Sequence, residues 1–204
     1  MTREIRTGFC EIPFTRLEHI TCRLFTGRRL IENLSLIGFH NTKRNDGKNT
    51  GKAVHFYMDD YKFECVWNQP ERYLRKLSQY RFVLTPDFSL YTNMPLAMQI
   101  WNVFRGQWCG AFWQANGLTV VPSVGWGDER SFAFCFDGIE KGATVAVSTL
   151  GAKKHKDAYL RGFEAMLERV QPERVICYSE PFPEMKGRVI PTPYLRGNGG
   201  WTEG

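Results

Sequence analysis

The sequence lacks a long hydrophobic run, and this absence excludes a conventional membrane-spanning helix. No stretch of the 204 residues approaches the roughly 20 consecutive apolar residues that cross a bilayer. The first residues also contain no apolar run of the length found in signal peptides. We therefore expect a soluble, cytoplasmic protein with no membrane partner.

Closely spaced pairs of metal ligands are also absent. The six cysteines lie far apart, and none forms the Cys-x-x-Cys pair that zinc ribbons and redox pairs require. The histidines show neither His-x-x-His nor His-x-Glu spacing. The sequence therefore predicts no zinc site, and the scattered cysteines favour a reducing compartment.

Acidic charge is scarce only in the first quarter of the chain. Residues 1–52 hold ten Lys or Arg and five Asp or Glu, which gives +5 of the net charge of +6. The remaining residues hold 17 basic and 16 acidic side chains and are nearly neutral. A basic front end suits a nucleotide, a nucleic acid or an acidic protein as partner, and an ordinary solvated surface is the alternative.

The length and apolar content suit a single domain. With 43% apolar residues, the chain can bury one core and is too short for two full domains. We predict a basic N-terminal extension over residues 1–53 that packs on the core, an α/β domain over residues 54–195 and a flexible tail over residues 196–204. Residues 41–52 contain no apolar residue, so we expect an exposed, mobile loop, with a hinge or a basic finger as the alternatives to a plain loop.

Short apolar segments, each followed by polar residues, alternate with helix-like patterns along the chain. The segments lie at residues 54–60, 82–87, 120–123, 144–148 and 175–178, with a shorter one at 189–192. Nearly continuous apolar strands separated by helices favour a mostly parallel sheet covered on both faces. We predict a five- or six-stranded sheet of successive βα units that forms a partial TIM-like barrel, with an open doubly wound sheet as the alternative.

The longest helical pattern covers residues 93–116 and carries a stripe of large apolar side chains. These side chains recur at three- and four-residue spacings and are Ile100, Trp101, Phe104, Trp108 and Phe112. A base-stacking platform would also need aromatic rings, but this spacing is typical of a helix face packed on a core. We therefore expect the stripe to be part of the core.

Three carboxylates follow predicted strands and belong to the carboxyl edge of the sheet, where sites collect in parallel folds. Asp60, Asp87 and Asp128 could together hold Mg²⁺ or Mn²⁺, or divide the general acid and general base roles between them. They are the catalytic candidates if the protein is an enzyme. Structural roles are the alternative, with Asp128 as a helix N-cap and Asp87 as a turn residue after Pro86.

The segment that follows the fourth predicted strand has the composition of an anion site. Ser148, Thr149 and Gly151 offer hydroxyls and close backbone approach, and Lys153 and Lys154 follow at the start of a predicted helix. Because lysines at a helix N-terminus oppose the helix dipole, a bound phosphate would explain their position. An exposed turn with solvated lysines is the alternative.

Trp126 lies between two glycines on another turn of the same edge, near Ser123. A large ring at this place could stack on a base or a sugar, and simple packing over the sheet is the alternative. These two residues complete the predicted ligand-binding set.

Several longer runs of the sequence carry a family resemblance. They are VHFYMDDYKFE at residues 54–64, WN at 67–68, PE at 70–71, TPDFSLY at 85–91, MPLA at 94–97, QIWN at 99–102, WGDE at 126–129 and CFDGI at 135–139. Together they resemble the bacterial, archaeal and phage family catalogued as domain of unknown function 4417. The resemblance implies a setting on phages or other mobile elements, and it brings no activity, cofactor or catalytic residue with it.

These observations lead to two functional hypotheses. The first is a cytosolic phage or mobile-element protein that binds a phosphate-bearing ligand, a nucleotide or nucleic acid, at the carboxyl edge of its sheet. The alternative is a metal-assisted phosphoester hydrolase that uses the clustered aspartates. Binding is favoured because the chain has no nucleophile and base at diagnostic spacing.

Overall fold

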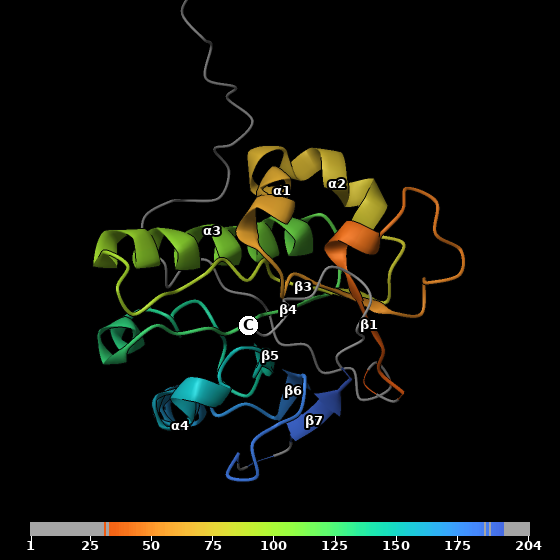
Figure 1. Cartoon of the computed structure of the whole chain (residues 1–204). Helices are drawn as coiled ribbons and strands as arrows, with labels where there is room; N and C mark the ends of the chain where they lie inside the picture. The colour runs from red at the N-terminus through yellow and green to blue at the C-terminus, as the bar shows by residue number, and fades with distance from the viewer. Residues whose placement is uncertain (1–30, 32, 186, 188, 194–204) are drawn as a thin grey trace, which may run out of the picture.

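Short parallel strands form the framework of the computed structural model, which describes residues 31, 33–185, 187 and 189–193 (Figure 1). The strands form one sheet of four in the order β1-β2-β3-β4 and one sheet of three in the order β5-β6-β7, and neighbouring strands run parallel. The strands are β1 (Leu36–Gly38), β2 (Ala53–His55), β3 (Phe82–Leu84), β4 (Val120–Val121), β5 (Thr144–Ser148), β6 (Arg174–Tyr178) and β7 (Val189–Thr192).

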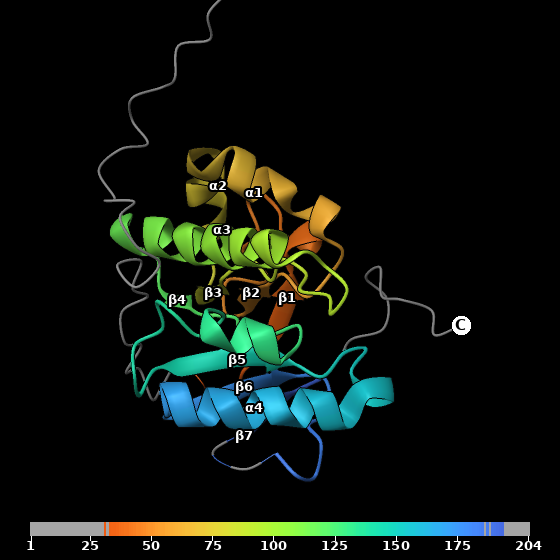
Figure 2. The ribbon, with the colours of Figure 1, turned by 90° about the vertical axis from the view of Figure 1, so that its left-hand side faces the viewer.

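Helices cover the two sheets from opposite sides. Figure 2 shows α1, α2 and α3 on one side of the strands and α4 on the other. The α-helices are α1 (Glu64–Asn68), α2 (Pro70–Leu77), α3 (Leu96–Ala115) and α4 (Lys156–Val170), and the 3-10 helices are η4 (Phe39–Asn41), η5 (Asp60–Lys62), η6 (Glu129–Ala133) and η7 (Lys153–His155). Within the described residues, none of these helices has both the length and the apolar character needed to cross a bilayer.

A parallel bridge between Ser123 and Ala146 links the two sheets. The N–H of Ala146 donates to the carbonyl of Pro122, and the N–H of Val124 donates to the carbonyl of Ala146, both at 2.8 Å. The backbone of Pro122 therefore faces β5, and proline has no N–H to donate to that strand. The missing donor explains why the link to β5 remains an isolated bridge. On the other side, the pairing of β4 with β3 ends at Val121 because the N–H of Ser123 donates to the Thr85 hydroxyl at 2.8 Å.

The two sheets face each other across a shared apolar interior. Six strands contribute side chains to it, and the contributing strand residues include Leu36, Ala53, Phe82, Leu84, Val121, Ala146 and Ile176. The ring of His55 on β2 lies 4.4 Å from the ring of Tyr178 on β6, measured between centroids. Two further clusters fill the space between the first sheet and α1 to α3, and between the second sheet and α4.

These observations confirm an α/β fold with parallel strands. They do not confirm the partial TIM-like barrel of five or six strands, because the described strands form one sheet of four and one of three, linked by a single bridge. The strand order follows the chain in both sheets, without the reversal that defines the doubly wound alternative. The predicted strands did not include β1, because the segment around it has no clear periodicity and allowed either a short helix or a short strand.

The predicted boundary at residue 53 falls at the start of β2. Because β1 pairs with β2 in the same sheet, residues 36–38 of the predicted N-terminal extension are part of the sheet. Residues 1–30 and the predicted tail at residues 196–204 lie outside the described residues. The packing of the extension and the flexibility of the tail therefore stay predictions.

The apolar stripe of α3 is buried only in part. Trp108 is buried in the cluster between the first sheet and helices α1 to α3, as expected for a core face. Trp101 is 48% exposed, and Ile100 beside it is also exposed. The 20-residue helix is about 30 Å long at 1.5 Å per residue. It is therefore much longer than the strands it covers, so its first turns extend beyond the core.

Trp126 packs directly on the backbone of α4 at Gly162. A Cβ atom added to Gly162 would overlap the indole ring, at Nε1 and Cδ1. The ring also contacts Tyr159, with centroids 5.0 Å apart, and Phe136, with centroids 6.3 Å apart. The glycine is thus required by close packing between α4 and the turn that carries Trp126.

We predict that Gly162→Ala destabilises the protein by about 1–3 kcal/mol, because the added methyl group displaces the Trp126 ring. The helix propensity of Ala acts in the opposite direction, by about 1 kcal/mol. Urea unfolding followed by circular dichroism measures the effect. Gly51→Ala is the control, since no atom lies within 4 Å of its added Cβ; equal stability of the two variants would contradict the packing.

Candidate functional site

Polar side chains follow the carboxyl ends of four neighbouring strands. Tyr57 lies two residues after β2, Asp87 three residues after β3 and Ser123 two residues after β4, and Ser148 ends β5. Because the strands are parallel, these ends lie at the same edge of the two linked sheets. The structure therefore brings the predicted residues Asp87, Ser123 and Ser148 together from separate parts of the sequence, beside Tyr57, which was not predicted.

Three hydroxyl groups at this edge are buried without a well-formed hydrogen bond in the described structure. They belong to Tyr57, Ser123 and Tyr159 of α4. Tyr57 is 7% exposed and Ser123 is 9% exposed. Burial raises the pKa of Tyr57 well above its usual value and the Asp87 carboxylate adds to this rise, whereas a poorly formed hydrogen bond with the Ser123 hydroxyl opposes it. Buried polar groups are normally hydrogen-bonded, so these three mark a place where a partner fits.

Asp87 is the least compensated carboxylate in this group. Burial, and then the neighbouring carboxylate of Asp60, raise its pKa from 3.8 to about 7. Asp60 accepts hydrogen bonds from the N–H of Ser89 at 3.2 Å and from its hydroxyl at 2.8 Å, and lies 3.9 Å from Arg105. The described part of the chain offers no such partner to Asp87. A carboxyl group that titrates near neutral pH can accept or donate a proton.

A small cavity opens beside Asp87, between the carboxyl edge and α3. Its volume is about 30 Å³, and its lining includes Thr85, Asp87, Asn102, Gly106 and Ser123. A cavity of this volume can hold a water molecule or one small polar group. A Cβ atom on Gly106 would lie 2.8 Å from the carbonyl of Pro86, so glycine allows α3 to approach the segment that carries Asp87.

Arg105 of α3 holds the surroundings of the site in place. Its guanidinium lies 3.7 Å from the centre of the Phe88 ring and donates to Glu64 at 2.6 Å and to Asn102 at 3.1 Å. It is the only charged residue in the helix, which is a signal that the sequence analysis did not use. Tyr159 was also missed, because its spacing placed it on the apolar face of α4.

The predicted anion-binding segment lies between β5 and α4. The Ser148 hydroxyl accepts a hydrogen bond from the N–H of Leu150, and the Thr149 hydroxyl donates to the carbonyl of Glu180 at 2.8 Å. Gly151 has a φ of +76°, and no atom lies within 4 Å of its missing side chain. The backbone is therefore open at Gly151, whereas both hydroxyls already take part in hydrogen bonds.

The lysines of this segment precede α4 and do not form its first turn. Lys153 and Lys154 are exposed in η7, and α4 begins at Lys156. Among these three lysines of the described structure, only Lys156 forms an ion pair, with Glu184. The predicted lysines thus stand one 3-10 turn before the helix, with their charges uncompensated.

Asp128 is not part of a metal-binding group with Asp60 and Asp87. Its carboxylate caps η6 by accepting the N–H of Arg130 at 3.0 Å and pairs with the Arg130 guanidinium at 2.7 Å. These contacts with Arg130 lower the pKa of Asp128. Within the described ranges, no three or more His, Cys, Asp or Glu side chains are grouped to hold a metal ion. The N-cap alternative therefore describes what Asp128 does in the structure.

The raised pKa of Asp87 should make the stability of the protein depend on pH. Since its pKa is raised to about 7, the folded state binds a proton between about pH 4 and pH 7 that the unfolded state has lost. The stability of the wild type should therefore fall relative to Asp87→Asn as the pH rises through this window. The change is at most about 1.4 kcal/mol per unit of pKa shift, reduced by partial solvent exposure.

Urea unfolding of both proteins at about pH 5 and about pH 8 measures this difference. Asp128→Asn is the matched control, because Arg130 lowers the pKa of that carboxylate and its removal cannot produce the same gain at high pH. A carbon NMR titration that placed the Asp87 midpoint near its ordinary value would contradict the prediction.

Comparison with known proteins places the chain in a family. Residues 20–193 match the family described as Domain of unknown function (DUF4417). The Gene 1 protein of Mycobacterium phage L5 is 44% identical over 140 residues, which cover 67% of this chain and 61% of the relative. The Gene 1 protein of Mycobacterium phage D29 is 47% identical over 132 residues, which cover 63% of this chain and 49% of the relative.

The matches with these two relatives therefore cover between about half and three fifths of their length. No solved structure matches the chain. The relatives support the prediction of a phage-associated protein, and the family match begins well inside the predicted N-terminal extension. The chain belongs to the DUF4417 family.

Proposed function

We propose that the protein binds a small phosphate-bearing ligand, such as a nucleotide, at the carboxyl edge of its sheets. In this proposal the phosphate lies against the segment between β5 and α4, and an uncharged polar part of the ligand reaches the Asp87 cluster. The observation that carries the proposal is the burial of the Tyr57, Ser123 and Tyr159 hydroxyls, none of which has a well-formed hydrogen bond in the described structure.

The Asp87 cluster favours a neutral hydrogen-bonding group. Asp60 and Asp87 place two carboxyl groups close enough to raise the pKa of Asp87, so a phosphate here would meet like charge. A sugar hydroxyl or a base amide can instead donate to Asp87 and accept from Tyr57 or Ser123. Such a group would supply the hydrogen bonds that these buried atoms lack.

The segment between β5 and α4 supplies the positive charge that a phosphate needs. Lys153 and Lys154 have no carboxylate partner in the described structure, and Gly151 leaves the backbone open to close approach. The two parts of the proposed site are neighbours, because Ser123 pairs with Ala146 and Ser148 lies two residues further along β5. Two residues of strand advance by about 6.6 Å, which is within the length of a nucleotide.

Thermal unfolding with a panel of nucleoside mono-, di- and triphosphates tests this proposal. A ligand that binds the folded state raises the melting temperature with concentration, by the equivalent of about 2.7 kcal/mol at 100 times Kd. The shift should be lost in the Lys153→Glu/Lys154→Glu double variant and kept in Lys141→Glu, which changes an exposed lysine before β5. Tyr57→Phe should weaken binding about tenfold, because it removes only the buried hydroxyl.

The absence of a shift with every phosphate compound would refute the proposal. A shift that survives the lysine double variant would refute the placement of the phosphate at this segment.

A second candidate function is phosphoester hydrolysis, and the closeness of Asp60 and Asp87 favours it. A carboxyl group with a pKa of about 7 suits a general acid or base, and the pair could hold Mg²⁺ or Mn²⁺ with further oxygens from the ligand. Asp128 has no part in this version. Product formation that requires the metal and is lost in Asp87→Asn would favour catalysis, whereas binding without turnover would favour the first function.

A further inference from the structure

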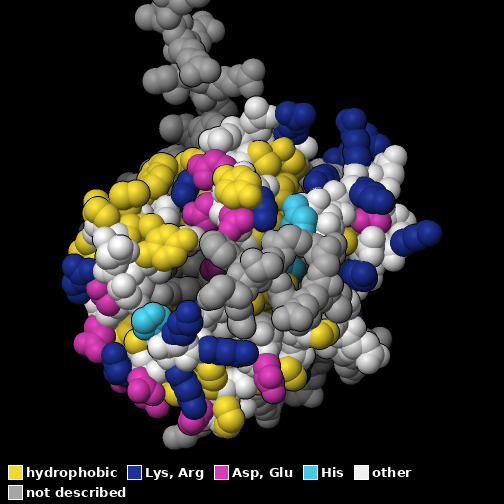
Figure 3. Space-filling view, in the orientation of Figure 1, with side chains coloured by type: hydrophobic (Ala, Val, Ile, Leu, Met, Phe, Trp, Pro, Cys, Tyr) yellow, Lys and Arg dark blue, Asp and Glu magenta, His cyan; other side chains and the backbone are white. Residues whose placement is uncertain are grey.

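A second basic surface lies on the loop between η4 and β2. Lys43, Arg44 and Lys48 are exposed there, and Lys52 is half-buried at the end of the loop. Figure 3 shows Lys and Arg side chains gathered on the right-hand side of the molecule, where Figure 1 places this loop. Asp46 is the one acidic residue within residues 43–52, and it is only 6% exposed.

Buried contacts hold this loop, which the sequence alone predicted to be mobile. Asp46 accepts hydrogen bonds from the Tyr80 hydroxyl at 2.8 Å and from the Asn49 amide at 2.7 Å. The side chain of Gln79 accepts the N–H of Asp46 at 2.9 Å and donates to the carbonyl of Lys43 at 2.7 Å. The inward-facing carboxylate thus fixes the backbone while the lysine and arginine side chains point to solvent.

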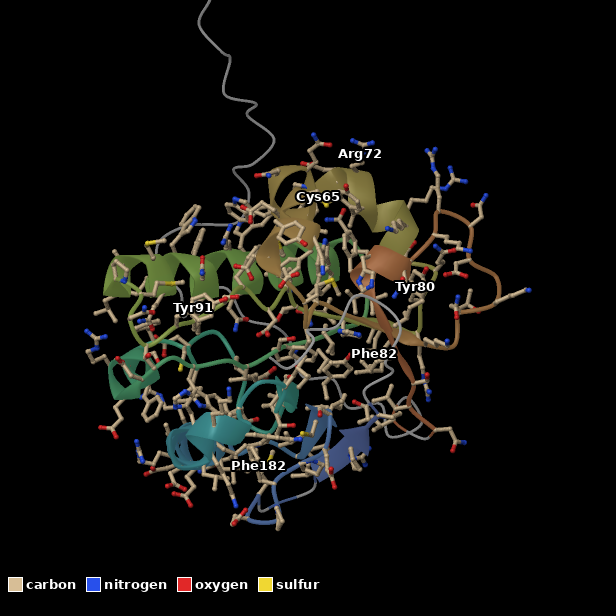
Figure 4. The ribbon with its side chains drawn as sticks, viewed as in Figure 1. Cys65, Arg72, Tyr80, Phe82, Tyr91 and Phe182 are labelled. Atoms are coloured by element: carbon tan, nitrogen blue, oxygen red, sulfur yellow. The ribbon has the colours of Figure 1, made fainter. Side chains whose placement is uncertain are left out.

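Helix α2 extends the same positive surface. Gln79 and Tyr80, which hold the loop, directly follow the last turn of this helix. Arg72 and Arg75 are exposed on α2, and Glu71 is the one exposed carboxylate of the helix. Figure 4 labels Arg72 at the top of the molecule and Tyr80 beside the loop. The loop and the helix together present five exposed cations and one exposed carboxylate.

We propose that this surface docks the sugar–phosphate backbone of a nucleic-acid duplex. Lysine and arginine heads on a fixed backbone match a regular array of phosphates, and counterion release supplies the affinity. Residues 41–52 contain no aromatic side chain on which an unpaired base could stack, so a duplex fits better than a single strand. The expected contacts are to phosphates and are independent of base sequence.

The duplex surface is separate from the proposed nucleotide site. The N–H of Arg81 donates to the carbonyl of Lys52, which places the end of the loop at the amino ends of β2 and β3. Asp87 lies beyond the opposite, carboxyl end of β3. Loss of nucleotide binding in the Lys153→Glu/Lys154→Glu variant therefore says nothing about duplex binding, and the two proposals can fail separately.

Fluorescence anisotropy of a labelled 20-base-pair DNA duplex, titrated with the full chain at several salt concentrations, tests the proposal. Contacts by three to five cations give a slope of log K against log salt of about −2.7 to −4.5. The triple variant Lys43→Gln/Arg44→Gln/Lys48→Gln should bind at least about tenfold more weakly, with a slope smaller by roughly 2 to 3. The control triple Lys141→Gln/Arg161→Gln/Arg169→Gln removes the same charge from exposed residues around α4 and should keep the wild-type slope.

The Asp46→Asn variant distinguishes binding that requires the fixed loop from binding that depends only on net positive charge. This substitution raises the net charge by one, so simple attraction predicts tighter binding. The proposal predicts weaker binding, because loss of the carboxylate frees the loop, and Tyr80→Phe should act in the same direction without a charge change. Circular dichroism and melting curves establish that both variants are folded at the assay temperature.

Three results would overturn the proposal. The first is that the wild type does not bind the duplex. The second is that the control triple variant loses as much duplex affinity as the loop triple variant, and the third is that a single strand binds more tightly than the duplex. Tighter binding by Asp46→Asn would overturn the role of the fixed loop.

Discussion

The parallel bridge between Ser123 and Ala146 is the constraint on which the arrangement of the carboxyl edge depends. It joins a sheet covered by α1 to α3 to a sheet covered by α4, and it does so at the strand ends that carry polar side chains. Tyr57 from the first sheet and Tyr159 from α4 therefore meet around Asp87, although 102 residues separate them in the chain. Without this link, the two halves would present unrelated edges.

The carboxylates of the described structure differ in how their charges are compensated. Asp60 has Ser89 and Arg105, Asp128 has Arg130, and Asp46 has Tyr80 and Asn49. Asp87 is partly buried at the same edge and has no comparable partner among the described residues. This contrast, more than the number of acidic residues, distinguishes a reactive or ligand-seeking group from structural ones.

The sequence supported the α/β class and the polar edge because strand ends in parallel folds follow a general rule. That rule was enough to select Asp87, Ser123 and Ser148. It could not show that Asp128 caps η6, because an N-cap and a site carboxylate have the same local pattern. The rule also could not show that the Tyr159 hydroxyl is buried without a hydrogen-bond partner among the described residues, because a tyrosine among regularly spaced apolar helix residues resembles an ordinary core residue. The division into two sheets could not be predicted either, because it depends on whether the backbone of Pro122 faces β3 or β5.

The contact between Trp126 and Gly162 has a mechanical consequence. The Trp126 indole contacts the backbone of α4 directly, with no side chain between them. No side chain can therefore change conformation to accommodate a small displacement of the turn relative to the helix. The turn bearing the indole and the middle of α4 must therefore shift together or not at all. Since α4 also carries Tyr159, any rearrangement of the helix would be transmitted in one rigid step to the hydroxyl beside Asp87.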